Sequence, residues 1–144
     1  IYYGDEAGVC GFTDPDSRRT YPWGQEDQEL IRYHKELIRI RKENPACRRG
    51  SGIPLYADGG HFAFGRFLVD NHVVTIINNT EEAVRLTVPV WQIEISDGEL
   101  LRRCVLSMED GFNLEKAHYL VSDGAIEIYM PPYSAAVMSQ TGEN

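Results

Sequence analysis

The chain has 144 residues, of which 42% are hydrophobic and 10% aromatic, and its formal net charge is −8. These values are typical of a globular protein with one domain, or with one domain and an extra element. The acidic balance, with no basic patch or tail, argues against a nucleic-acid partner and against an anionic membrane surface. The apolar runs are also far shorter than a membrane span.

Cysteine and histidine usage indicates neither a disulfide framework nor a metal site. His61, His72 and His118 lie far apart in the sequence and suggest no nucleophile–base pair. No CxxC or Cys/His metal spacing occurs, and the cysteines are scattered and odd in number: Cys10, Cys47 and Cys104. We therefore expect a cytoplasmic protein with reduced thiols, no metal and no cofactor.

The first 46 residues combine a loop and a helix. The stretch "IYYGDEAGVCGFTDPDSRRTYPWG" starts with three strand-like residues and continues as a loop of the kind that lies over binding clefts. The next segment has apolar residues at helical spacing, acidic residues first and basic residues last, and it stops at Pro45. This pattern predicts a helix at about 26–43. Its apolar stripe must dock on the following domain, on missing elements or on another copy of the chain.

From Ile53 onward the sequence reads as short strands separated by turns. "HFAFGRFLV" and "HVVTIINN" flank the turn signal "DN", and "SDG" occurs twice between further alternating segments. Seven or eight such strands predict a mainly β fold, an antiparallel Greek-key β-sandwich, over residues 47–144. The triplet "NNT" at 78–80 fits a glycosylation sequon but is better explained as a tight hairpin turn. The final "TGEN" is expected to fray.

The opening loop concentrates the side chains that sugar sites use. Carboxylate and guanidinium groups hydrogen-bond to hydroxyls, and aromatic faces stack on pyranose rings. A retaining glycosidase needs two carboxylates about 5 Å apart. Spacing alone supports no such pair among Asp5, Glu6, Asp14 and Asp16. From spacing alone, "DPDSRR" is better explained as a turn in which Asp14 pairs with Arg18.

Other conspicuous side chains have structural explanations. Trp23 fits a packed anchor, and His34 fits a satisfied, half-buried position on the apolar side of the helix. In the sandwich, Trp91, Tyr119 and Tyr133 would suit glycan binding if they were exposed. Packing in the core or at an edge is the favoured interpretation, because sandwiches fill their interior with such residues.

The segment "IYYGDEAGVCGFTDPDSRRTYPW" resembles the α-amylase superfamily, glycoside hydrolase family 13, and in particular the neopullulanase, cyclomaltodextrinase and maltogenic amylase group. In that family "IYYGDE" forms the eighth strand of a (β/α)8 barrel. The helix "ELIRYHKELIRIRKENPA" resembles the eighth barrel helix, and the rest resembles the β-sandwich appended to the barrel, domain C. The resemblance implies that residues 1–46 end the barrel and residues 47–144 form the sandwich.

The resemblance also implies where the chemistry lies. The catalytic carboxylates of the family come from strands four, five and seven, which would precede Ile1, so we expect no catalytic residue in this chain. The family's loop Asp, and the Arg four residues later, contact a donor-side sugar; these match Asp14 and Arg18. The resemblance thus favours substrate binding for this pair. Arg19 and Trp23 match the motif as scaffolding.

These observations lead to two functional hypotheses. In the first, the chain is the C-terminal fragment of a retaining α-glucan hydrolase that acts on maltodextrin, pullulan or cyclodextrin. The fragment would be inactive by itself and would close and support the barrel. In the second, the sandwich is a carbohydrate-binding module that holds starch or maltodextrin without catalysis. Either way the expected partner is an α-glucan, with self-association through the exposed helix stripe (Leu30, Ile31, Leu37 and Ile38).

Overall fold

The fold is described from a computed structural model, which defines residues 1–140. The chain divides into two compact units, Ile1–Ile40 and Arg41–Asn144. The predicted division at residues 46 and 47 remains a prediction. The "TGEN" segment expected to fray lies outside the described residues.

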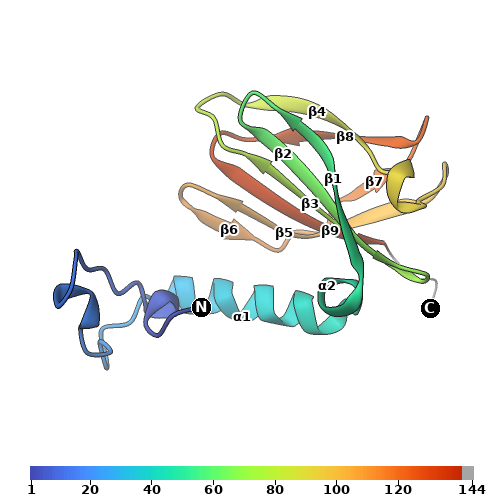
Figure 1. Cartoon of the computed structure of the whole chain (residues 1–144). Coiled ribbons are helices and arrows are strands. Elements are labelled where there is room, and N and C mark those ends of the chain that lie inside the picture. The colour runs from blue at the N-terminus through green and yellow to red at the C-terminus, as the bar shows by residue number, and fades with distance from the viewer. Residues whose placement is uncertain (141–144) are drawn as a thin grey trace. The chain divides into compact units, whose positions relative to one another are not determined.

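The second unit is a β-sandwich, as the sequence predicts (Figure 1). Its larger sheet has the order β1-β2-β3-β9-β5-β6, with β7 also paired to β5, and all pairs are antiparallel. The smaller sheet pairs β4 with β8. The bounds in the larger sheet are β1 Ser51–Asp58, β2 His61–Leu68, β3 Asn71–Asn78, β5 Leu100–Met108, β6 Gly111–Asn113, β7 His118–Leu120 and β9 Ser134–Gln140. Those in the smaller sheet are β4 Val84–Pro89 and β8 Ala125–Met130.

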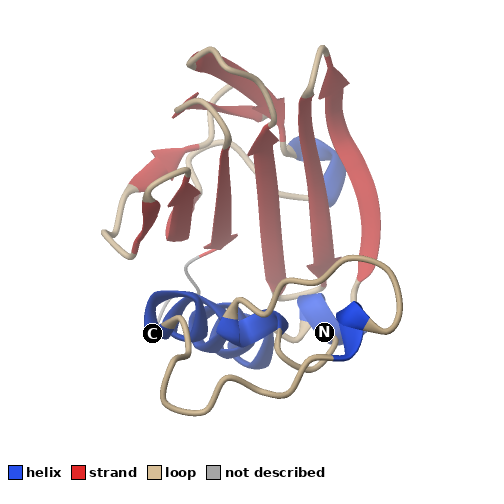
Figure 2. Cartoon of the chain, turned by 90° about the vertical axis from the view of Figure 1, so that its left-hand side faces the viewer, coloured by secondary structure: helices blue, strands red, loops and turns tan. Residues whose placement is uncertain are grey.

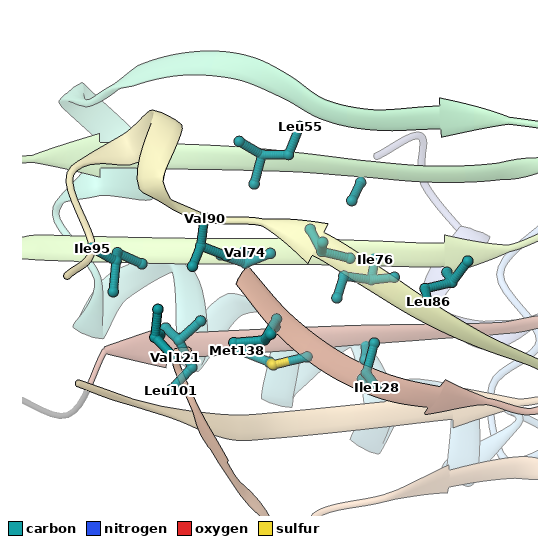
Figure 3. Close-up of a cluster of buried hydrophobic side chains, with 14 of the residues drawn as sticks. Leu55, Val74, Ile76, Leu86, Val90, Ile95, Leu101, Val121, Ile128 and Met138 are labelled. Carbon is teal, nitrogen blue, oxygen red and sulfur yellow. The ribbon is translucent and has the colours of Figure 1, made fainter. Parts of the chain in front are cut away.

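Alternating apolar residues place the core between the two sheets. In β4 and β8, the inward positions are fully or almost fully buried: Leu86, Val88, Ile126, Ile128 and Met130. They meet Val74, Ile76 and Met138 from the larger sheet, as Figure 3 shows for several of these side chains. The long strands of that sheet run side by side in Figure 2. Burial of this apolar surface is the main source of stability, at about 25 cal/mol per Å² removed from water.

Two turns differ from the sequence predictions. Leu68 pairs with Asn71, so the β2–β3 turn consists of Val69 and Asp70, one residue earlier than predicted. Asn71 belongs to β3 because its backbone pairs with Leu68, and its side chain accepts a hydrogen bond from the backbone N–H of Ala46 at 2.9 Å. Residues 78–80 form a turn but no hairpin, because the chain leaves the larger sheet here and enters the smaller one.

The predicted helix is confirmed, and the prediction of a strand at the start of the chain is wrong. Helix α1 spans Gln28–Glu43, and Asp27 caps it by accepting a hydrogen bond from the N–H of Leu30 at 2.9 Å. A short second helix, α2 at Ala46–Arg49, was not predicted. Ile1–Tyr3 form no strand, because no described segment supplies the backbone partners that a strand requires. None of the helices within residues 1–140 is long and apolar enough to cross a membrane.

Candidate functional site

The loop of the first unit contains a tight turn around Asp14. The 3-10 helix η2, at Asp16–Arg18, follows directly, and the Asp14–Pro15 peptide bond is cis. The N–H of Asp16 donates to the carbonyl of Thr13, and the N–H of Arg18 donates to that of Pro15, both at 3.0 Å. The turn brings the side chains of Asp14 and Arg18 together, with Nη2 of Arg18 2.8 Å from the Asp14 carboxylate.

Asp14 and Arg18 form an exposed ion pair. The guanidinium of Arg18 donates to the Asp14 carboxylate through Nη2 at 2.8 Å and Nε at 3.3 Å, and Ser17 Oγ donates to the same carboxylate. The Arg18 guanidinium, and then the Ser17 hydroxyl, lower the pKa of Asp14 below its ordinary value. Yet 69% of the Arg18 side chain and 61% of the Asp14 side chain remain exposed. The pair is thus oriented and charged, with free hydrogen-bonding capacity toward solvent.

The neighbouring pair, Asp16 and Arg19, holds the loop together. Asp16 accepts a hydrogen bond from the N–H of Phe12 at 2.9 Å, and Arg19 donates three to it at 2.8–3.0 Å. The backbone N–H of Phe12, and then Arg19, lower the pKa of Asp16. Tyr3 adds a hydrogen bond from its hydroxyl to the carbonyl of Arg19 at 3.0 Å. This pattern fits the scaffolding role expected of Arg19.

Gly11 allows the close approach that folds the loop. A Cβ atom at this position would lie 2.7 Å from the carbonyl oxygen of Asp16 and 2.9 Å from the Cα of Ser17. Both neighbours are backbone atoms, which cannot move aside at low cost, so only glycine fits. The close contact of Gly11 with the backbone of Asp16 and Ser17 therefore holds in place the turn that carries Asp14 and Arg18.

The remaining carboxylates at the start of the loop serve local turns. Asp5 accepts from the N–H of Tyr2 at 2.8 Å, and Glu6 accepts from that of Gly4 at 3.1 Å. Within residues 1–140 no group of three His, Cys, Asp or Glu side chains is placed to hold a metal ion. Among the loop carboxylates described here, Asp14 is thus the one paired with the most exposed guanidinium, that of Arg18.

Trp23 is not a packed anchor, contrary to the sequence prediction. It is 81% exposed, and its ring lies 4.6 Å from that of Tyr21, centroid to centroid. The contact with Tyr21 leaves most of the indole in solvent. By contrast His34 is half-buried, with Nδ1 2.9 Å from the carbonyl oxygen of Leu30, so the satisfied histidine predicted there is confirmed.

The three aromatic side chains of the sandwich also differ from one another. Tyr119 is half-buried and packs against the core, as predicted. Trp91 is 64% exposed and Tyr133 is 46% exposed, so neither lies in the core, and of the predicted packing in the core or at an edge only the edge remains for both. Trp91 begins the 3-10 helix η3, Trp91–Ile93, which buries Ile93 and leaves Trp91 toward solvent.

The chain is similar to enzymes whose names refer to α-glucans. No family model matches it. The amylopullulanase of Thermoanaerobacter thermohydrosulfuricus is 36% identical over the whole chain, which covers 10% of that protein. Neopullulanase 2 of Thermoactinomyces vulgaris is 33% identical over 96% of the chain, which covers 22% of that protein.

Solved structures give the same result. An α-amylase from Anoxybacillus superposes on 99% of the chain with a TM-score of 0.81 and 29% identity, over 29% of that protein. The chain is therefore related to the α-amylase superfamily, glycoside hydrolase family 13, as its motifs indicated. Within that superfamily it resembles the C-terminal part of the neopullulanase, cyclomaltodextrinase and maltogenic amylase group. It spans about a tenth of the length of the amylopullulanases it matches.

Proposed function

We propose that this chain works as the C-terminal part of a retaining α-glucan hydrolase, in which Asp14 and Arg18 hold a donor-side glucose residue. The observation that carries the proposal is the exposed Asp14–Arg18 pair, which is oriented by Ser17 and mounted on a turn fixed by other residues. The similarity to enzymes named for pullulan and cyclomaltodextrin supports the choice of an α-glucan.

The chemistry of the pair suits a sugar with neighbouring hydroxyls. The ionised Asp14 carboxylate accepts a hydrogen bond from one hydroxyl, and the Arg18 guanidinium donates to the next. Because each holds the other in place, the sugar meets a group that is already oriented, which lowers the entropy lost on binding. This role positions the substrate and involves no bond cleavage.

The chain itself is proposed to be inactive. A retaining mechanism requires two carboxylates about 5 Å apart, whereas the loop carboxylates are occupied by backbone N–H groups and guanidinium groups. Within the longer enzyme, residues 1–46 would close the barrel and the sandwich would support its last helix. Incubation of the purified chain with maltodextrin should release no reducing sugar.

The binding role is best tested in a chimera that supplies the rest of a barrel. In it, this chain replaces the aligned segment of the Thermoactinomyces vulgaris neopullulanase 2. Arg18→Ala should lower kcat/KM for pullulan by roughly 10–100-fold, the effect of losing a charged hydrogen bond to the bound sugar. Arg39→Ala is the control: it removes the Arg39–Glu36 ion pair of α1, at 2.7 Å and away from the loop, and should change kcat/KM by less than about threefold. Equal losses in the two variants would contradict the assignment.

We further propose that the protein is cytoplasmic and that two copies associate through α1. The three cysteines are free, which supports the expected cytoplasmic location. The apolar stripe of α1 is incompletely covered, with Ile38 41% exposed, which supports pairing of two copies through this helix. Sedimentation of the purified chain should reveal a dimer that Ile38→Glu dissociates, and a monomer at every concentration would rule it out.

A further inference from the structure

The outward face of the smaller sheet carries aromatic and polar side chains together. β4 and β8 are antiparallel, with Arg85 opposite Tyr129 and Thr87 opposite Glu127. These four side chains are exposed, whereas the residues between them point into the core. Figure 1 shows β4 and β8 together at one side of the sandwich, with the turn that carries Trp91 directly after β4.

Trp91 is exposed and yet firmly mounted. The backbone N–H groups of Val90 and Trp91 both donate to the carbonyl of Gly124 at 2.9 Å, and the N–H of Gly124 donates to Asp97 at 2.7 Å. A Cβ atom at Gly124 would lie only 3.0 Å from Cδ1 of the Trp91 ring. The indole therefore rests against the glycine backbone, and 64% of the residue remains open to solvent.

Tyr129 forms a second exposed aromatic surface, on the outward face of β8. It is 55% exposed, and the guanidinium carbon of Arg85 lies 6.0 Å from the centre of its ring. Ala125, next to the Gly124 on which Trp91 rests, is four residues away along β8, or about 14 Å at the usual rise per residue. Thr87 and Glu127 lie between these ends and present a hydroxyl and a carboxylate.

We propose that this outward face of β4 and β8, with Trp91, binds an α-glucan chain. Pyranose rings would lie on Trp91 and Tyr129, and their hydroxyls would bond to Glu127, Thr87 and Arg85. The two aromatic surfaces are separated by polar groups and form no continuous apolar patch, which suits a sugar chain better than a protein partner. The identity of the sugar rests on the proposed function, but the site belongs to the sandwich and uses none of the loop residues.

Isothermal titration of the full 144-residue chain with maltoheptaose tests this site. The chain should bind saturably, and Trp91→Ala and Tyr129→Ala should each weaken binding at least about tenfold, the loss seen when an aromatic anchor is removed. Phe62→Ala is the matched control, because Phe62 is an exposed aromatic residue of β2 in the other sheet. It should leave the affinity unchanged, and circular dichroism should show the same fold in all variants, since these side chains are exposed.

The outcomes separate this site from the loop. Binding that Trp91→Ala abolishes and Arg18→Ala leaves unchanged supports the sandwich site, whatever the chimera shows for the loop. Binding that depends on Arg18 but not on Trp91 or Tyr129 overturns it while leaving the proposed function in place. Absence of saturable heat also overturns it, as does a Trp91-dependent dimer that binds no maltoheptaose.

Discussion

Asn78 is the polar residue whose loss should destabilise the sandwich most clearly. It is 1% exposed at the end of β3, where the chain crosses between the sheets. Its Nδ2 donates to the carbonyls of Pro131 at 2.7 Å and Glu82 at 2.8 Å, and its Oδ1 accepts from the N–H of Thr80 at 3.1 Å and from its hydroxyl at 2.7 Å. Asn78→Ala leaves these groups without their partner.

The size of the effect follows from this geometry. A hydrogen bond contributes about 0.5–1.5 kcal/mol net. Water can reach the exposed Glu82 and the half-buried Thr80, and the Pro131 carbonyl keeps a hydrogen bond from Ser134 Oγ at 2.6 Å, so the cost comes chiefly from the lost hydrogen bonds of Asn78 and from the cavity. We therefore expect Asn78→Ala to lower the free energy of unfolding by about 2–4 kcal/mol.

Urea unfolding followed by circular dichroism measures this difference. The neighbouring Asn79→Ala is the control, because Asn79 is exposed and should change the free energy of unfolding by less than about 0.5 kcal/mol. Asn78→Asp should be at least as harmful as Asn78→Ala, because it removes both donors and places a carboxylate against carbonyl oxygens. If the two asparagine-to-alanine variants were equally stable, the bridging role of Asn78 would be refuted.

Three further predictions concern the core, the thiols and the loop. Ile76→Ala, at a fully buried position, should cost about 2–5 kcal/mol in urea unfolding, and a loss below 1 kcal/mol would mean the site is not tightly packed. Iodoacetamide at pH 8 should modify the exposed Cys10 well before Cys47, because burial raises the pKa of the Cys47 thiol; mass spectrometry showing the reverse order would contradict this. The pKa of Asp14 in the folded chain lies below the ordinary 3.8, so its stabilising pairing with Arg18 is fully present above that value and is lost as pH falls through the lowered pKa. Carboxyl NMR titration should give a pKa below 3.8 for Asp14, and Arg18→Ala should raise it.

Periodic patterns explain which parts of the fold could be predicted. The 3.6-residue spacing that ends at Pro45 defines α1, and alternation defines strands such as β4, because both patterns record burial directly. The prediction of a strand at Ile1–Tyr3 was wrong because strand formation depends on pairing partners, which the sequence of the segment itself does not reveal. The sequence also did not predict that β4 joins the smaller sheet. The residues of "NNT" carry no information on the pairing of β4 with β8, which lies some 40 residues further on.

The candidate sites also combine features that the sequence predicts with features that it does not. The i, i+4 spacing of Asp14 and Arg18 predicted their contact, and the structure has it at 2.8 Å. The exposure of Trp91 was missed because it depends on the 3-10 helix Trp91–Ile93, which buries Ile93 and which the sequence did not predict. The glycine contact that mounts its ring joins residues far apart in sequence and could not be predicted.

A crystal structure of the neopullulanase chimera soaked with a maltooligosaccharide tests most directly whether Asp14 and Arg18 hold a glucose residue, as proposed. Sugar hydroxyl oxygens should lie within hydrogen-bonding distance, about 2.7–3.2 Å, of both side chains. A bound sugar chain that passes the loop while Asp14 and Arg18 contact only each other would contradict it.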